Sequence, residues 1–325
     1  MNLEKLTDLK KQLDELRPLK QEVLDNLEKW FEIELTYSSN ALEGNTLTRM
    51  ETSIVLEKGF TVSGKPLKDH LEAVNHYDAL LCIKKMVGSK GFTLDQILYI
   101  HKLILKGIED DHAGSIRTIP VRISGSAVVL PNYVKVPQLL KNFVADIDAS
   151  KDHPVKIAAM AHYNLVSIHP FIDGNGRTAR LLMNLILLQS GYPPVIIHPK
   201  NRLKYLKSLE KAQMGGDITD YLNLVYKAVQ NSFTIYLKAL KNETLPQKNI
   251  SSLMKIGELS KKTEESVATL RYWTKIGLLE VKSTTTSGYQ LYDEAQIYRS
   301  KKIRNLQKER YNLEEILKLI DDSHT

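Results

Sequence analysis

The stretch HPFIDGNGRTAR, from His169 to Arg180, lies between two apolar segments with helical spacing. Its DGNG core is typical of a tight turn, because glycine and asparagine tolerate left-handed backbone conformations. A turn that leads directly into a helix also leaves backbone N–H groups without acceptors at the positive end of the helix dipole, which favours an anion. From the residue types alone, a plain connecting turn and an anion-binding loop are equally open interpretations.

The charged residues around this turn favour the anion-binding interpretation. Arg177 and Arg180 lie three positions apart on the expected helix, so both point to roughly the same side and each can bind phosphate oxygens as a fork. Asp173 can ligate Mg²⁺, which proteins hold with one or two carboxylates plus phosphate oxygens. His169 titrates in the range suited to accepting a proton from a hydroxyl. The stretch therefore predicts a site that transfers part of a nucleotide.

HPFIDGNGRTAR resembles the signature of the Fic family, HxFx(D/E)GNGRxxR, at every defining position, and supporting similarity covers roughly residues 35–240. The resemblance implies a mainly α fold, with a Fic-type helical bundle and a β-hairpin flap. It also implies transfer of AMP from ATP to a Tyr, Thr or Ser hydroxyl of a target protein and of the enzyme itself. His169 would be the general base and Asp173 the Mg²⁺ ligand. The phosphates would be bound by Gly174, Asn175, Gly176, Arg177 and Arg180.

Residues 118–130 alternate in polarity around Gly125 and Ser126, which predicts two short strands joined by a tight hairpin. By the same resemblance, this hairpin would be the flap on which an extended target segment docks by strand addition. Val121, Ile123 and Gly125 would then be the docking residues. From the pattern alone, a purely structural hairpin is equally open.

The segment SSNALEGN holds Ser39 and Glu43 four residues apart, followed by Gly44. The residue types alone favour a helix end with an exposed glutamate and a capping glycine. The segment also resembles the (S/T)xxxE(G/N) inhibitory helix of Fic proteins, which implies that Glu43 pairs with Arg180 and blocks placement of the γ-phosphate. In some members the same glutamate supports removal of AMP, so the forward and reverse reactions both stay open.

Residues 253–325 form a second predicted domain after a linker at 245–252. KIGELSKKT and SVATLRYWTKIGLL fit two short helices, STTTSGYQLYDEAQ fits a hairpin, and YNLEEILKLI fits a last helix. The pieces TLRYW, SGYQLYD and NLEEI resemble the winged helix-turn-helix DNA-binding domain of the MerR family. A helical adaptor that binds protein is the alternative.

The MerR resemblance implies contacts with double-stranded DNA. Thr269, Arg271 and Tyr272 would enter the major groove, and Lys282 and Tyr289 would meet backbone phosphates. Two half-sites on DNA need a two-fold dimer, so the resemblance also implies a homodimer that other parts of the chain would form.

The 325-residue chain has 42% apolar and 26% charged residues, as expected for a globular protein, and its net charge of +7 favours anionic partners. We expect N-terminal helices with the inhibitory segment at 1–50 and a catalytic core at 51–244. The single cysteine, Cys82, excludes an internal disulfide and indicates a reducing compartment. The charged N-terminus and the lack of a long apolar run predict no signal peptide and no membrane span, hence a cytoplasmic protein.

Three functions stay open. The leading one is an auto-inhibited adenylyltransferase that uses ATP and Mg²⁺ and carries a DNA-binding domain. The second is a transcription regulator whose Fic-like pocket only senses a nucleotide, although a sensor has no need of the base His169. The third is a Fic enzyme that mainly removes AMP or uses another nucleotide.

Overall fold

The computed structural model describes residues 3–19, 21–89, 91–240, 253–284, 289–309, 311–313 and 315–317. The chain divides into two compact units, Met1–Glu243 and Thr244–Thr325. The predicted linker at 245–252 lies outside the described residues, and the predicted division at residue 50 stays a prediction. In the part of the chain that the structure describes, no helix combines the length and apolar character that a bilayer span requires.

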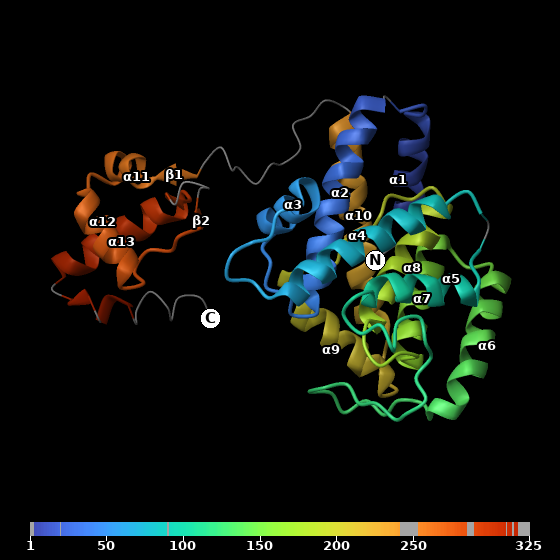
Figure 1. The fold of residues 1–325 in the computed structure, drawn as a ribbon. Helices are drawn as coiled ribbons and strands as arrows, with labels where there is room; N and C mark the ends of the chain where they lie inside the picture. Colours follow the sequence, from blue (N-terminus) through green and yellow to red (C-terminus); the bar gives the residue numbers. More distant parts are fainter. Residues whose placement is uncertain are drawn as a thin grey trace. The chain divides into compact units, whose positions relative to one another are not determined.

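The first unit is built from helices, as predicted (Figure 1). They are α1 (Leu3–Glu15), α2 (Gln21–Leu42), α3 (Arg49–Lys58), α4 (Leu67–Lys85), α5 (Leu94–Leu105), α6 (Val136–Ala149), α7 (Pro154–Ile168), α8 (Asn175–Gln189), α9 (Arg202–Gln213) and α10 (Thr219–Leu240), with 3₁₀ turns η1 (Tyr133–Lys135) and η2 (Pro199–Asn201). Pro18 separates α1 from α2, because proline cannot continue a helix.

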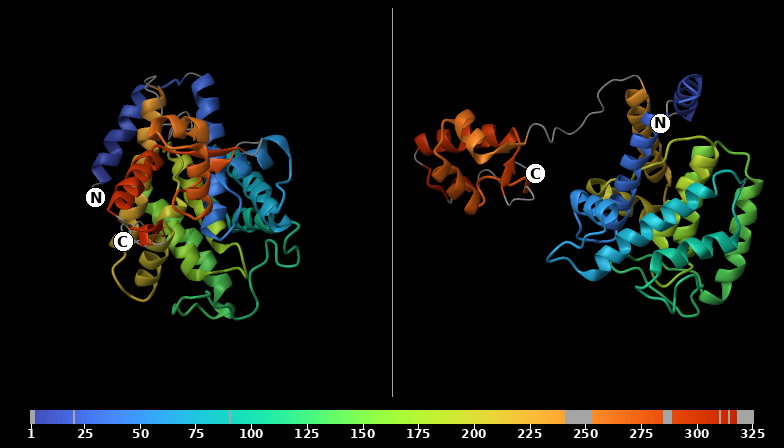
Figure 2. Two further views of the ribbon diagram at one scale, coloured as in Figure 1. Left: turned by 90° about the vertical axis from the view of Figure 1, so that its left-hand side faces the viewer. Right: turned by 45° about the horizontal axis from the view of Figure 1, so that its top comes forward.

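Helices α7 and α8 form the centre of this unit, and α2, α4, α5, α6 and α10 pack around them (Figure 2). Every residue of α8 from Arg177 to Leu187 is buried, so this helix is enclosed on all sides. The small residues Ala158, Ala159 and Ala161 on α7 lie in the same core. The loop between α7 and α8 is therefore fixed at both ends by the most buried helices of the fold.

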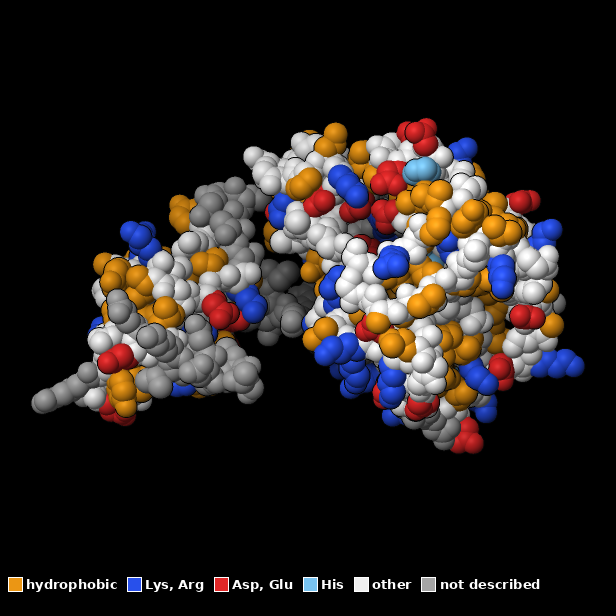
Figure 3. Space-filling view, turned by 90° about the horizontal axis from the view of Figure 1, so that it is seen from below, with side chains coloured by type: hydrophobic (Ala, Val, Ile, Leu, Met, Phe, Trp, Pro, Cys, Tyr) orange, Lys and Arg blue, Asp and Glu red, His pale blue; other side chains and the backbone are white. Residues whose placement is uncertain are grey.

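The segment expected to be a β-hairpin flap does not form paired strands. A turn closes where the Ser126 N–H donates to the Ile123 carbonyl over 3.2 Å, but residues 118–131 are assigned neither helix nor strand. The segment is fixed at its base and tip by side chains instead of by a ladder of backbone hydrogen bonds. Two of its apolar side chains are exposed to solvent, Ile119 by 52% and Val129 by 93%. Apolar side chains are also spread over the face of the first unit seen in Figure 3.

The second unit contains β1 (Met254–Lys255), α11 (Ile256–Thr263), α12 (Val267–Lys275), β2 (Ser283–Thr284), β3 (Gln290–Tyr292) and α13 (Ala295–Lys308). Its strands form an antiparallel sheet in the order β1-β3-β2, with Met254 opposite Tyr292 and Ser283 opposite Leu291. A core of its own surrounds Trp273 and Leu259. The two-helix and sheet pattern expected of a winged helix-turn-helix domain is confirmed.

Candidate active site

The loop after α7 is shaped by residues with left-handed backbone conformations. His169 ends α7 with φ 51° and ψ 60°, and its N–H still donates to the Leu165 carbonyl. Gly174, with φ 77°, precedes α8, a conformation that favours glycine. Between them Phe171 is fully buried and anchors the loop in the core. The chain thus reverses within a few residues and presents His169 and the start of α8 to the same region.

Asn175 closes this loop from the inside. Its side-chain amide donates to the Phe171 carbonyl over 2.9 Å, and its amide oxygen accepts the Phe171 N–H over 3.0 Å. The side chain is therefore used to hold the turn. What Asn175 offers an anion is its backbone N–H, since first-turn amides of a helix have no intrahelical acceptor.

His101 on α5, which no local sequence pattern marks as functional, supports the loop from behind. Its ring stacks on Phe171 with centroids 3.6 Å apart. Nδ1 accepts the Gly114 N–H over 3.0 Å, so Nε2 carries the proton and donates to the Asp173 carbonyl over 3.0 Å. Burial, the main cause, lowers the pKa of His101 to about 4, which keeps the ring neutral in this role.

The side chain of His169 is set up to accept a proton. The Val166 carbonyl, 3.2 Å from Nδ1, can only accept, so Nδ1 carries the hydrogen and Nε2 is left as the basic nitrogen. Burial lowers the pKa of His169, with Arg117 acting in the same direction, so the neutral form prevails near pH 7. Arg117 also fixes the loop. Its side-chain Nε donates to the His169 carbonyl over 2.8 Å, and its backbone N–H donates to the Pro170 carbonyl.

Glu43 and Arg180 are brought together from distant parts of the chain. Glu43 Oε1 lies 2.6 Å from Arg180 Nη2, and Ser39 accepts from the same guanidinium through its hydroxyl and its carbonyl, both at 2.9 Å. Gly44, with φ 102°, lets the chain turn away just after the glutamate. A Cβ atom at Gly176 would collide with the Glu43 carboxylate, so this glycine leaves open the space that Glu43 occupies.

Arg180 has a further partner in Tyr205, whose hydroxyl lies 3.5 Å from Nη1. Tyr205 is 2% exposed, so it offers no open face for stacking. A chain of hydrogen bonds continues from it, because Tyr221 donates to the Ala159 carbonyl and can only accept from His162 Nδ1 over 2.8 Å. His162 Nε2 therefore accepts the Tyr205 hydroxyl proton over 2.8 Å. This buried chain orients Arg180 from behind.

Arg177 contacts different groups from Arg180, so the two arginines do not form the paired clamp expected from their spacing. Arg177 Nη1 lies 2.9 Å from Glu72 Oε1 on α4, and Nη2 lies 3.1 Å from Asp173 Oδ2. Its side chain is only 2% exposed. The reason is the packing of α8 against α4, which places one arginine against Glu72, while the other meets α2.

Asp173 is the one acid of the loop. Burial opposes its ionisation, but Arg177 and the Gly174 N–H outweigh burial, and the pKa of Asp173 lies below its usual value. Its carboxylate keeps 41% of its surface exposed beside the start of α8. Among the described residues, no three His, Cys, Asp or Glu side chains are grouped as a metal site. A single carboxylate next to an anion site fits Mg²⁺ held largely by phosphate oxygens.

The predicted docking residues of the flap lie near the turn, with Val121 and Ile123 half-buried and Gly125 exposed. The turn is bound at its tip by Glu210 of α9, whose Oε1 accepts from the Ser126 hydroxyl over 2.7 Å and from the Ala127 N–H over 3.0 Å. This contact fixes the turn without strand pairing.

The predicted DNA-contacting residues of the second unit lie at its surface. On α12, Arg271 and Tyr272 are exposed while Trp273 is buried, and Thr269 is half-buried at the helix start, where its N–H donates to the Ser266 hydroxyl. Outside the helix, Lys282 is 56% exposed and lies 3.6 Å from Asp293, and Tyr289 is exposed beside Lys255. Exposed side chains on α12 are what a groove-reading helix needs.

Comparison with known proteins gives two family matches. Residues 91–187 match the Fic/DOC family, and residues 254–323 match the MerR HTH family regulatory protein. Protein adenylyltransferase fic-1 of Caenorhabditis elegans is 38% identical over 213 residues, which are 64% of this chain and 42% of that protein. Protein adenylyltransferase Fic of Aedes aegypti is 36% identical over 69% of this chain and 45% of its own. The matched region thus spans less than half the length of these curated relatives.

Two solved structures are also similar. A Fic domain containing signaling protein from Bacteroides thetaiotaomicron has a TM-score of 0.67 and 30% identity, over 73% of this chain and 98% of that one. A fragment of C. elegans Fic-1 has a TM-score of 0.67 and 35% identity, over 74% of this chain and 72% of its own.

Proposed function

Because the chain belongs to the Fic/DOC family, we propose that it is a protein adenylyltransferase that moves AMP from ATP to a Tyr, Thr or Ser hydroxyl of a target protein and of itself. One observation carries the proposal. A single loop presents a neutral histidine with a free Nε2, an ionised aspartate and the N-terminal amides of α8. A sensor of nucleotides has no use for the base.

In the proposed reaction, a hydroxyl oxygen of the target attacks the α-phosphorus of ATP. His169 Nε2 takes the hydroxyl proton, the bond from the α-phosphorus to the bridging oxygen breaks, and pyrophosphate leaves with that electron pair. The lowered pKa of His169 favours the neutral form that this step requires. The loop supplies position and charge more than covalent chemistry.

The phosphates of ATP would lie on the amides of Asn175, Gly176 and Arg177, with Arg180 on the terminal phosphate. Asp173 would hold Mg²⁺, which when bound neutralises charge on the phosphate oxygens. Arg177 does not clamp phosphate in this proposal, since Glu72 and Asp173 use its guanidinium.

Glu43 would act as a brake. A carboxylate and a terminal phosphate compete for one guanidinium, and Glu43 already holds Arg180 at 2.6 Å. It also fills the space beside Gly176 that a phosphate would need. We therefore propose that the enzyme is auto-inhibited until Glu43 leaves Arg180.

The test is incorporation of α-labelled ATP into protein, with Mg²⁺ present. Wild type, Glu43→Gly and the double variant Glu43→Gly/His169→Ala are compared under matched conditions. Label that rises in the first variant and vanishes in the second supports transfer, base and brake together. No label in any of the three, with ATP binding intact, would instead support a regulator that senses nucleotide.

For the second unit we propose binding of double-stranded DNA through α12, which the MerR match and the exposure of Arg271 and Tyr272 support. Two half-sites would require a homodimer. The test uses DNA duplexes selected from random sequence on the full chain, followed by mobility shifts. Arg271→Ala should lower affinity about tenfold, the scale of one base contact; unchanged affinity would contradict the groove-reading role. We also propose a reducing compartment, the cytoplasm, which the single cysteine of the sequence supports.

A further inference from the structure

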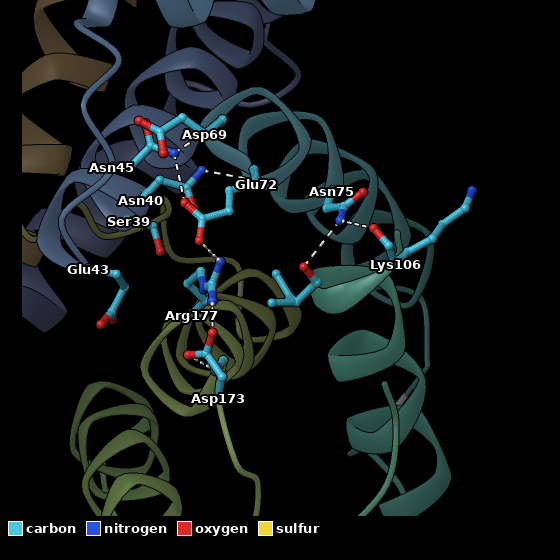
Figure 4. A network of polar contacts seen from close by, with 12 residues as sticks. Ser39, Asn40, Glu43, Asn45, Asp69, Glu72, Asn75, Lys106, Asp173 and Arg177 are labelled. Atoms are coloured by element: carbon cyan, nitrogen blue, oxygen red, sulfur yellow. Dashed lines mark hydrogen bonds and ion pairs between the residues drawn. The ribbon is translucent and has the colours of Figure 1, made fainter. Parts of the chain in front are cut away.

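Arg177 lies inside the protein between two carboxylates from different elements. Glu72 of α4 lies 2.9 Å from one guanidinium nitrogen and Asp173 lies 3.1 Å from another (Figure 4). The exposed fractions of the side chains differ sharply, being 2% for Arg177, 9% for Glu72 and 41% for Asp173. The pair with Glu72 is therefore a buried ion pair, and only Asp173 faces solvent.

The charges of these three groups explain why two carboxylates are needed. A buried guanidinium is costly without a counter-charge. If Asp173 were the sole counter-ion, a divalent cation that drew its carboxylate away would leave Arg177 unpaired inside the protein. With Glu72 present, Arg177 stays neutralised whether or not Asp173 also holds a cation.

We propose that Glu72 is a positioning residue for the cation site: it holds and neutralises Arg177, and so leaves the carboxylate of Asp173 available to a divalent cation. The inference rests on the proposed function, in which Asp173 is the metal ligand. Glu72 acts through Arg177 and does not itself contact the reacting groups.

Glu72 is in turn fixed by the segment that carries the brake. Asn45 donates to Glu72 Oε2 over 2.8 Å, and Asn40 donates to the Glu72 carbonyl over 3.2 Å (Figure 4). Asn40 lies near the end of α2 and Asn45 follows Glu43 by two residues. The inhibitory segment and the cation site therefore share one support, and a shift of residues 43–45 reaches Asp173 through Glu72 and Arg177.

The experiment measures Mn²⁺ binding by electron paramagnetic resonance on the full chain saturated with a non-hydrolysable ATP analogue. The parent carries Glu43→Gly, and the test variant adds Glu72→Gln. We expect Mn²⁺ affinity to fall by about tenfold or more, the scale of losing an outer-sphere partner, while affinity for the metal-free analogue stays within about twofold. Equal Mn²⁺ affinity in parent and Glu72→Gln would overturn the proposal.

A second variant separates the charge argument from a packing effect. Glu72→Gln/Arg177→Met removes both charges of the buried pair, so Mn²⁺ affinity should return to within about threefold of the parent. If Glu72→Gln alone fails to fold, this double variant still tests the proposal. A folded double variant with Mn²⁺ binding lost would overturn the proposal.

Two controls complete the design. Glu32→Gln alters an ion pair of α2 with Lys84 of α4, 2.8 Å away and outside this network, and should leave Mn²⁺ affinity unchanged. Asp173→Ala tests the proposed function itself. If Asp173→Ala keeps full Mn²⁺ affinity, the metal assignment fails; if it abolishes binding while Glu72→Gln has no effect, only the role of Glu72 fails.

Discussion

The two units place their candidate functional side chains in opposite ways. In the first unit Arg177 and Arg180 are 2% and 5% exposed and bonded to acids on other elements. In the second unit Arg271 and Tyr272 project from a helix whose opposite face carries the core residue Trp273. Chemistry at a fixed geometry needs immobilised groups, whereas reading a DNA groove needs groups that protrude. Function and stability are therefore coupled in the first unit and separable in the second.

The largest difference expected between the two units is in how their free energies of unfolding depend on pH. Burial lowers the pKa of His76 and His162 to about 3, with Arg180 adding to the effect, and burial lowers that of His101 to about 4. Below pH 6.5 these histidines become protonated in the unfolded chain but stay neutral in the folded unit. The stability of the first unit is therefore fully present above pH 6.5 and is lost as the pH falls. Each histidine lowers the free energy of unfolding by up to ~1.4 kcal/mol per pH unit, so the three together lower it by about 4 kcal/mol at pH 5.5.

The measurement uses the two tryptophans, one in each unit. Trp30→Phe leaves Trp273 to report on the second unit, and Trp273→Phe leaves Trp30 to report on the first. Urea unfolding at pH 7.5, 6.5 and 5.5 should show a steeper loss in the first unit than in the second, because none of the described residues of the second unit is a histidine. Parallel losses in both units would contradict the contrast.

The next contrast compares one buried arginine with one exposed arginine. Arg177→Met leaves Glu72 without its counter-ion, which should cost about 3 kcal/mol of unfolding free energy in the first unit. Arg271→Met should change the second unit by no more than about 0.5 kcal/mol. Urea unfolding with the same single-tryptophan chains measures both, and a cost below about 1 kcal/mol for Arg177→Met would remove the distinction.

A smaller effect is expected at Tyr205. Tyr205→Phe removes the hydroxyl between Arg180 and His162 and leaves His162 Nε2 buried without a donor, a cost of about 1–2 kcal/mol. Because Arg180 loses one of its supports, binding of ATP should weaken more than binding of ADP, which lacks the terminal phosphate. Calorimetry with both nucleotides, on chains that carry Glu43→Gly so that Arg180 is open to the terminal phosphate, measures the ratio of the two affinities.

The matched control is Tyr226→Phe, a buried tyrosine of α10 outside this chain of hydrogen bonds. It should leave the ratio of ATP to ADP affinity unchanged. Equal weakening of ATP and ADP by Tyr205→Phe would indicate a structural role alone.

Local patterns in the sequence predicted much of this architecture. The turn before α8 was predicted from its glycines and asparagine. The break between α1 and α2 at Pro18 and the capping box of Thr93 and Gln96 at the start of α5 obey equally local rules. The predicted pairing of Glu43 with Arg180 spans 137 positions, and it came from a family resemblance and not from spacing.

The parts that sequence reasoning missed depend on contacts between distant elements. Nothing in the local sequence of α4 marks Glu72 as the partner of Arg177, 105 positions away. The three-residue spacing of Arg177 and Arg180 indicated a common face, but helix packing gave them different partners. The alternation around Gly125 predicted strands, yet side-chain contacts from Glu210 fix that turn without a ladder.

The smallest expected effect concerns Lys282 of the second unit. Its ammonium is 56% exposed and 3.6 Å from Asp293, so the pair is a surface contact, and Lys282→Ala should change unfolding free energy by no more than about 0.5 kcal/mol. If Lys282 meets a DNA phosphate, the variant should weaken binding uniformly across sequences and reduce the slope of log affinity against log salt by about 1. Titrations of a selected and an unrelated duplex at several salt concentrations measure this slope. A loss of stability without a change in slope would mean that this unit, like the first, depends on its charged side chains for folding. The two units would then not differ in how function and stability are coupled.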